Sequence, residues 1–189
     1  MRIIAGKYRG RKLKSPPSLQ TRPTSDRLRE TLFNVLAAQI KGARFLDLCA
    51  GSGAVGIEAL SRGALHATFV DQSLRMCALI QANLDALEVD KSEIEVVNSE
   101  AGEFLRRRGK EEVEPFDIIF YDPPYASDYE ALLNCVGEQT KRSLAEDGII
   151  IVEHYRKNEL REEFGSLVRH RVLKQGDSAL SVYQIAIST

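Results

Sequence analysis

The sequence has few of the residues from which metal sites and disulfide frameworks are built. Its 189 residues include only three cysteines and three histidines. The cysteines, at positions 49, 77 and 135, show no C-x-x-C spacing, and the histidines, at positions 66, 154 and 170, are scattered. An odd number of cysteines without this spacing argues against a disulfide framework and against a zinc site. We therefore expect no bound metal and a reducing compartment, of which the cytoplasm is the simplest.

Long apolar runs are absent as well. No stretch of the chain has the roughly 20 consecutive apolar residues that a membrane-spanning helix needs, and the first ten residues lack the apolar core of a secretory signal peptide. With 43% hydrophobic and 28% charged residues, the composition is ordinary for a soluble globular protein. A chain of this length suffices for one domain with a sizeable core, so we expect a single domain over residues 1–189, a monomer, and no membrane partner.

The net charge is close to zero, but it is unevenly distributed. The formal net charge is −1, yet residues 1–44 contain eleven basic and only two acidic residues, so that they carry +9 and the remainder −10. Such segregation predicts a local contact with a polyanion, with a solvated basic face as the alternative. The basic residues that we assign to RNA contact are Arg2, Lys7, Arg9, Arg11, Lys12, Lys14 and Arg22.

Turn residues and apolar periodicity predict a basic N-terminal hairpin, followed by a helix. The hairpin covers residues 2–14, and a Ser-Pro-Pro-Ser linker follows it, so that residues 1–20 form a basic arm and residues 21–189 the core. Thr24 or Ser25 can cap the next helix. Its apolar stripe at helical spacing consists of Leu28, Leu32, Val35, Leu36 and Ile40.

From residue 44 onward, predicted strands and helices alternate. Strands are predicted at residues 45–48, 67–70, 94–97, 117–121 and 149–152. Helices are predicted at residues 54–62 and 73–87, through residues 104–105, and at residues 129–144. A short helical stretch at residues 158–164 and an antiparallel hairpin, with strands at 168–174 and 179–187, complete the pattern. The alternation predicts an α/β fold with a parallel, doubly wound sheet.

A glycine-rich segment follows the first predicted strand. Asp47 stands at the carboxyl end of that strand, and Gly51, Gly53 and Gly56 follow with the G-x-G-x-x-G spacing. Asp71 ends the second predicted strand about 20 residues further on, where a dinucleotide site has its ribose-binding acid, so a dehydrogenase is one alternative. A carboxylate directly before the glycine loop disfavours a pyrophosphate and favours a ligand with an ammonium group.

S-adenosylmethionine carries such an ammonium group, together with a sulfonium, a ribose diol and an adenine. Asp47 would meet the ammonium group, Asp71 would accept both ribose hydroxyls, and Glu100 would accept from the adenine amine. Each acid could instead satisfy backbone N–H groups at a helix start. The residues that we assign to cofactor binding are Thr24, Asp47, Ala50, Gly51, Ser52, Gly53, Asp71, Gln72, Glu100, Ala101 and Asp122.

The fourth predicted strand ends abruptly at Asp122-Pro123-Pro124-Tyr125. Proline cannot donate to a strand ladder, and the carboxyl ends of strands in open α/β sheets are where ligands bind. An ordinary turn with two prolines is the alternative. As a candidate catalytic set, these four residues suit a flat base with an exocyclic amine. Asp122 and the Pro123 carbonyl would accept its two N–H groups, and Tyr125 would stack on the base.

Asp47–Gly53, Asp71 and Asp122–Tyr125 together resemble S-adenosylmethionine-dependent methyltransferases that act on exocyclic amines. The opening Arg2-Ile-Ile-Ala-Gly6, the segment Arg22–Leu36 and the pattern Leu46–Gly63 resemble the RsmD family of 16S ribosomal RNA guanine-N2 methyltransferases. This resemblance covers nearly the whole chain. It implies a Rossmann-like seven-strand methyltransferase fold with an antiparallel last strand. It also implies 16S ribosomal RNA or the small ribosomal subunit as partner, and S-adenosylhomocysteine as product.

Three other functions fit parts of this pattern. DNA adenine-N6 methyltransferases share the Asp-Pro-Pro-Tyr chemistry, but they normally need a target-reading domain, for which the short segment before the fifth predicted strand leaves little room. Protein-glutamine methyltransferases resemble Asn-Pro-Pro-Tyr, whereas this chain has Asp122. A non-catalytic RNA-binding module on the same fold would not need acids at three strand ends.

Overall fold

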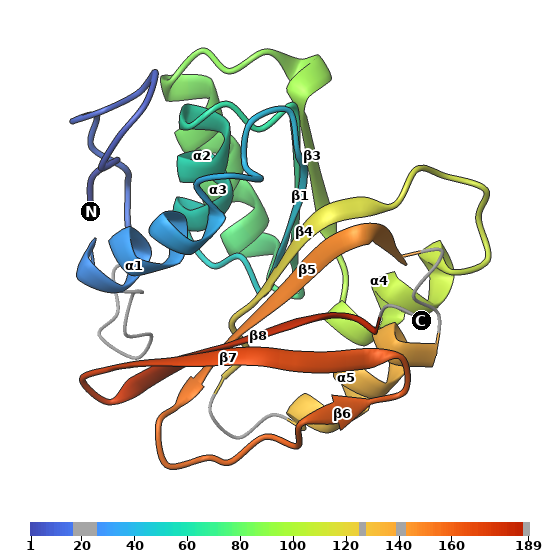
Figure 1. The fold of residues 1–189 in the computed structure, drawn as a ribbon. Coiled ribbons are helices and arrows are strands. Elements are labelled where there is room, and N and C mark those ends of the chain that lie inside the picture. The colour runs from blue at the N-terminus through green and yellow to red at the C-terminus, as the bar shows by residue number, and fades with distance from the viewer. Residues whose placement is uncertain (17–25, 125–127, 139–142, 187–189) are drawn as a thin grey trace. The chain divides into compact units, whose positions relative to one another are not determined.

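A computed structural model of the protein describes residues 1–16, 26–124, 128–138 and 143–186. The chain forms two compact units, Met1–Ser99 and Glu100–Thr189, whose elements are labelled in Figure 1. Both units combine helices with β-strands, as the α/β prediction requires. None of the helices in the described residues has the length and apolar composition that a bilayer crossing demands.

The first unit contains a parallel sheet with the strand order β3-β2-β1. Because β1 and β2 are parallel neighbours, their carboxyl ends lie at the same edge, and Asp47 and Asp71 are both found there. The elements of this unit are α1 (Asp26–Leu36), β1 (Arg44–Leu48), α2 (Ala54–Ser61), β2 (His66–Asp71), α3 (Leu74–Ala86), the 3-10 turn η1 (Lys91–Glu93) and β3 (Ile94–Asn98).

The predicted stripe of α1 is largely buried. Leu28, Leu32 and Leu36 are at most 3% exposed, and Ile40 is buried beyond the end of the helix. Val35 is only partly buried, whereas Phe33, which the predicted stripe does not include, is 1% exposed. The start of this helix, predicted at Thr24 or Ser25, lies outside the described residues.

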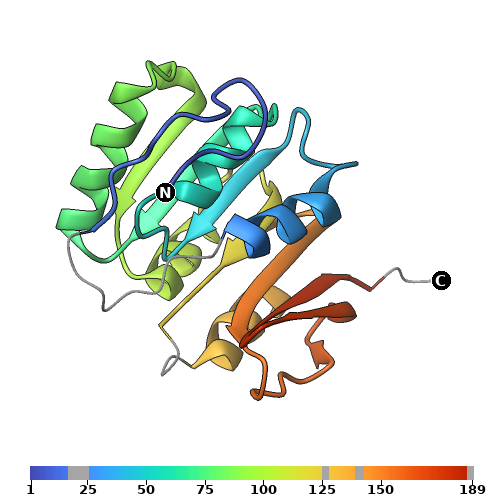
Figure 2. The ribbon, with the colours of Figure 1, turned by 90° about the vertical axis from the view of Figure 1, so that its left-hand side faces the viewer.

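The predicted N-terminal hairpin is present, and it packs against the helices of the first unit. An antiparallel bridge joins Arg2 to Lys12, and the Ile3 amide donates to the Arg11 carbonyl over 3.0 Å. Ile3, Tyr8 and Leu13 are at most 6% exposed. In Figure 2 the hairpin, in dark blue, lies against α2 and α3. It therefore shares the core of the first unit.

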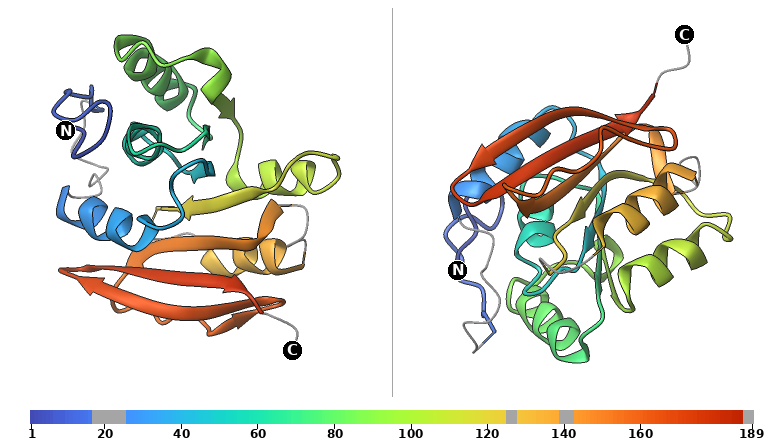
Figure 3. Two further views of the ribbon diagram at one scale, coloured as in Figure 1. Left: turned by 45° about the horizontal axis from the view of Figure 1, so that its top comes forward. Right: turned by 90° about the horizontal axis from the view of Figure 1, so that it is seen from below.

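The second unit contains a mixed sheet with the order β4-β5-β8-β7-β6. β4 and β5 are parallel, whereas β8 runs antiparallel between β5 and β7, so the predicted antiparallel last strand is confirmed (Figure 3). The elements are α4 (Ala101–Arg108), β4 (Phe116–Tyr121), α5 (Tyr129–Glu138), β5 (Leu144–Tyr155), β6 (Glu163–Phe164), β7 (Leu167–Gln175) and β8 (Ser178–Ile185).

The helical stretch predicted at residues 158–164 is wrong. This segment is irregular and ends in the short strand β6. The Arg161 carbonyl accepts from the Tyr183 hydroxyl over 2.8 Å, and the Leu160 carbonyl accepts from Arg169 Nη1 over 2.6 Å. Side chains of β8 and β7 thus bond two carbonyls of this segment. The aromatic ring of Phe164 packs edge-on against that of Tyr183.

Candidate active site

The segment between β1 and α2 forms a tight loop in which the glycines have distinct roles. Gly51 and Gly53 have φ angles of 56° and 75°, which residues with a side chain rarely adopt. At Gly56 a Cβ atom would lie 2.3 Å from the ring of Phe69, so only glycine allows this contact between α2 and β2. A Cβ atom at Gly51 would meet nothing closer than 4.0 Å, which leaves space for a ligand beside the loop.

Asp71 is joined directly to this loop. Its Oδ2 accepts from the Gly51 amide over 2.9 Å, and its Oδ1 accepts from the Ser73 amide over 2.9 Å. A carboxylate oxygen has two lone pairs, so each oxygen can accept a further hydrogen bond. The two amides thus orient a half-buried carboxylate that fits a ribose diol. The neighbouring Gln72, also assigned to the cofactor, is exposed.

Asp47 is buried at the base of the loop, with an exposed fraction of 2%. Its Oδ2 accepts from the Gly56 amide over 2.8 Å, in the first turn of α2. Burial raises the pKa of Asp47 to about 8, although the hydrogen bond from Gly56 opposes this shift, and the charge of Asp71 adds to it. A cationic group beside this carboxyl would favour its ionised form, and the ammonium group of S-adenosylmethionine meets that requirement.

The remaining loop residues also lie beside Asp71 and Asp47. The Ala50 amide donates to the Val70 carbonyl over 3.1 Å, and the Gly53 amide donates to the Ala50 carbonyl over 2.8 Å. Ser52 is buried between the two glycines. The structure therefore brings together the cofactor residues predicted at the ends of β1 and β2, and their arrangement fits the ribose and the ammonium group.

Glu100 caps helix α4 in the second unit. Its Oε1 accepts from the Gly102 amide over 2.9 Å, and its Oε2 accepts from the Glu103 amide over 3.0 Å. The alternative that each acid satisfies backbone N–H groups therefore holds for Glu100, as it does for Asp47 and Asp71, whose carboxyl groups accept from loop and helix amides. Ala101 is buried in the first turn of α4. The adenine contact assigned to Glu100 and Ala101 stays a prediction.

Asp122 follows the last residue of β4 and is half-buried, while Pro123 is buried and Pro124 exposed. The ring of Tyr121, just before it, meets Tyr129 edge-on at 6.2 Å, and Tyr129 in turn meets His154 at 6.4 Å. These buried rings pack together at the end of β4, directly before the candidate catalytic segment. Tyr125, predicted to stack on the base, lies outside the described residues.

His154, on β5, closes this series of rings. Its Nε2 lies 2.9 Å from the hydroxyl of Ser181 on β8, and burial lowers the pKa of His154 below its usual range. The imidazole thus joins β5 to β8 and contacts the ring of Tyr129.

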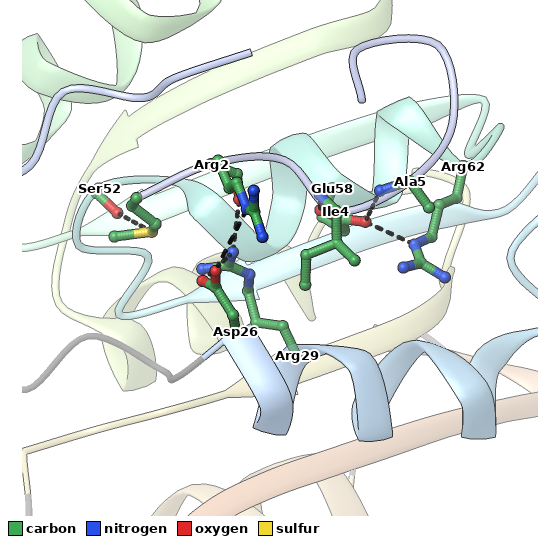
Figure 4. Close-up of polar contacts among 9 residues, drawn as sticks. Arg2, Ile4, Ala5, Asp26, Arg29, Ser52, Glu58 and Arg62 are labelled. Atoms are coloured by element: carbon green, nitrogen blue, oxygen red, sulfur yellow. Dashed lines mark hydrogen bonds and ion pairs between the residues drawn. The ribbon is translucent and has the colours of Figure 1, made fainter. Parts of the chain in front are cut away.

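Buried charged side chains anchor the hairpin to the first unit (Figure 4). The carboxylate of Glu58, which is fully buried in α2, accepts from the Ile4 and Ala5 amides over 2.8 Å and 3.0 Å, and it pairs with Arg62 over 2.7 Å. Arg29 pairs with Asp26 over 2.9 Å and donates to the Arg2 carbonyl over 2.7 Å.

Arg29 is one of the eleven basic residues that suggested a polyanion contact, but it is only 1% exposed. Because its guanidinium is buried and pairs with Asp26, Arg29 does not belong to the exposed basic face. The six described residues assigned to RNA contact, by contrast, are all exposed: Arg2, Lys7, Arg9, Arg11, Lys12 and Lys14. Arg22, the seventh, and Thr24 lie outside the described residues.

Sequence reasoning missed the buried polar residues that hold the hairpin, of which Glu58 and Asn83 are examples. Glu58 lies within the otherwise apolar run of α2, and Asn83 lies between the buried residues Ile80 and Leu84 of α3. Asn83 is 2% exposed and bonds to both the hairpin and the glycine loop. A single polar residue at a buried helical position was the signal that could have revealed each of them.

The raised pKa of Asp47 predicts how the stability of the cofactor-free protein depends on pH. The folded state holds this proton up to about pH 8, whereas the unfolded chain releases it near the ordinary value of 3.8. The free energy of unfolding should therefore fall as the pH rises from 4 to 8. Asp47→Asn should reduce this fall and should raise stability above pH 8, as measured by urea unfolding. Asp147→Asn, at an exposed carboxyl, is the control, and equal pH profiles for Asp47→Asn and wild type would contradict the assignment.

Comparison with known proteins identifies the family. A family model described as "Conserved hypothetical protein 95" matches residues 1–184. The chain is 40% identical to the putative rRNA methyltransferase YlbH of Bacillus subtilis (strain 168), over 97% of this chain and 98% of that protein. It is also 40% identical to the ribosomal RNA small subunit methyltransferase D of Escherichia coli (strain K12), over 97% of this chain and 89% of that protein.

The solved structure of the putative methyltransferase yhhF from Escherichia coli aligns with a TM-score of 0.85 at 39% identity, covering 100% of this chain and 99% of that chain. The predicted Rossmann-like methyltransferase fold is therefore confirmed, with eight strands in the described residues where seven were predicted. The chain belongs to the family described as Conserved hypothetical protein 95, which is the RsmD family of methyltransferases.

Proposed function

We propose that the protein transfers a methyl group from S-adenosylmethionine to the exocyclic N2 amine of a guanine in 16S ribosomal RNA. The observation that carries this proposal is Asp122-Pro123 at the carboxyl end of β4, where a carboxylate and a backbone carbonyl follow a buried strand. The ribosomal RNA substrate is supported by the names of two relatives that are 40% identical to this chain.

The first unit supplies the cofactor contacts in this proposal. S-adenosylmethionine, when bound, supplies a methyl group made electrophilic by its sulfonium. Asp47 pairs with the ammonium group, and this pairing offsets the cost of keeping a buried carboxylate ionised. Asp71 accepts from the ribose hydroxyls with lone pairs that Gly51 and Ser73 leave free, and the missing side chain of Gly51 lets the ligand approach.

The second unit supplies the amine contacts. The lone pair of guanine N2 is delocalised into the ring, which makes this nitrogen a poor nucleophile. Asp122 and the Pro123 carbonyl each accept one of its N–H groups, and drawing both out of the ring plane favours a pyramidal nitrogen with an available lone pair. As the N–C bond forms and the methyl–sulfur bond breaks, the amine gives up one proton, and Asp122 is the acceptor that we assign to it.

RNA affinity comes from the exposed cations of the hairpin. These residues contact phosphate groups and so position the protein without reading the base sequence. The arginines at positions 106–108 contribute less, because Arg108 is buried, donates to the Glu114 carbonyl over 2.8 Å and stacks on Phe116.

Asp122→Asn should lower the rate of methyl transfer while leaving RNA binding nearly unchanged. The substitution keeps the shape but places an amide donor against an amine N–H, so we expect a loss of roughly 10²-fold or more. The measurement is single-turnover transfer of a labelled methyl group to 16S ribosomal RNA or small subunits from cells that lack the protein. Asp147→Asn removes the same charge at an exposed site and should keep the wild-type rate. A wild-type rate for Asp122→Asn would refute the proposed role.

Neutralising two exposed hairpin residues should weaken RNA binding in a salt-dependent way. For Arg9→Gln with Lys12→Gln, the slope of log K against log salt concentration should flatten by about 0.7–0.9 per lost phosphate contact. Filter binding of 16S ribosomal RNA at several salt concentrations measures the slope. A double variant of the second unit, Lys110→Gln with Lys157→Gln, removes the same charge and should change the slope less. Equal slopes for the hairpin variant and wild type would show that these residues only face solvent.

A further inference from the structure

The side-chain amide of Asn83 joins the end of the hairpin to the glycine loop. Its Oδ1 accepts from the Lys14 amide over 2.8 Å, while its Nδ2 donates to the Lys14 carbonyl over 3.1 Å and to the Ser52 carbonyl over 3.0 Å. A side-chain amide has two N–H groups, and both are used here. Because Asn83 is 2% exposed, water cannot easily replace these bonds.

The two segments that Asn83 joins have different ligands in the proposed function. On one side, Lys14 is exposed and follows Lys12 on the cationic hairpin. On the other side, Ser52 lies between Gly51 and Gly53, next to the amide that orients Asp71. The Met1 sulfur, 3.8 Å from the Ser52 hydroxyl, is a second contact between the hairpin and the loop (Figure 4).

Glu58 also bonds to the hairpin, but, unlike Asn83, it does so without a bond to the glycine loop among the described contacts. Glu58 lies in the middle of α2, outside the glycine loop, and its carboxylate accepts from the Ile4 and Ala5 amides. Its bonds fix the hairpin to the helix. Those of Asn83 make the position of the Lys14 backbone and the position of the Ser52 carbonyl depend on the same side chain.

We propose that Asn83 is a positioning residue that couples RNA binding at the hairpin to cofactor binding at the glycine loop. This inference rests on the proposed function, because it requires RNA at Lys12 and Lys14 and the cofactor beside Gly51. Phosphate contacts that hold the hairpin in place also hold Asn83, and through it Ser52. The glycine loop then loses less conformational entropy when the cofactor binds. By linkage, the cofactor tightens RNA binding by the same factor.

The test is the affinity for S-adenosylhomocysteine, measured by calorimetry with and without a saturating 16S ribosomal RNA transcript. This ligand is not consumed, and it lacks the sulfonium charge that RNA would attract unspecifically. RNA should tighten its binding to the wild-type protein by roughly 5-fold or more, within the usual range of coupling between sites. In Asn83→Leu and Asn83→Asp this factor should fall towards one. Gln81→Leu is the control, because its side-chain amide bonds to Asp85 within α3 and not to the hairpin or the glycine loop in the described residues, and it should keep the wild-type factor.

The coupling factor separates positioning from a merely structural role. A structural lesion would weaken S-adenosylhomocysteine binding equally with and without RNA, so an unchanged factor in the Asn83 variants would overturn the proposal. Asn83→Asp keeps the acceptor for the Lys14 amide and covers the case in which Asn83→Leu does not fold. If both ligands bind the wild-type protein but RNA leaves the S-adenosylhomocysteine affinity unchanged, the proposed coupling is overturned and the proposed function is not. Failure of either ligand to bind the wild-type protein would instead overturn the proposed function.

Discussion

The burial of one carboxyl group, that of Asp47, is the constraint on which the rest of the site depends. Its hydrogen bond to the Gly56 amide requires the first turn of α2 to lie close to β1, and the absence of a side chain at Gly56 lets the same turn pack against Phe69. This contact sets where the glycine loop begins, and the loop in turn orients Asp71 through the Gly51 amide. Removing such a carboxyl from water is costly, and the raised pKa reflects that cost. A ligand cation would offset it.

The hairpin is a structural part of the first unit as well as a cationic surface. Glu58 is fully buried, and two of its hydrogen bonds come from hairpin amides. Deleting the hairpin would leave this carboxylate with Arg62 but without those donors, and loss of a partner to a buried charge is strongly destabilising. Single charge changes on its exposed face are therefore the sounder way to study RNA binding. The same integration allows Asn83 to touch both the hairpin and the loop.

The sequence predicted those features that depend on local periodicity and on backbone limits. Apolar runs ended by glycine, proline or acids gave the order of strands and helices, and the glycine spacing placed the loop beside Asp71. The prediction failed where side chains from distant elements decide the structure. The helix expected at residues 158–164 is replaced because Tyr183 and Arg169 bond its carbonyls. Arg29, which the sequence analysis counted among the basic residues of the N-terminal region, forms an ion pair with Asp26 of the same helix. No local pattern carries such information, because it depends on partners far along the chain.

The central claim is that Asp47 is buried so that it can hold a ligand ammonium group. If so, cofactor binding at pH 7 must release a proton, because a carboxyl with a pKa of about 8 is mostly protonated before the cation arrives. Calorimetry of S-adenosylhomocysteine binding in two buffers with different ionisation enthalpies measures the number of protons released. The account predicts a release approaching roughly one proton at pH 7, and its loss in Asp47→Asn. Binding without proton release in the wild-type protein would contradict the account.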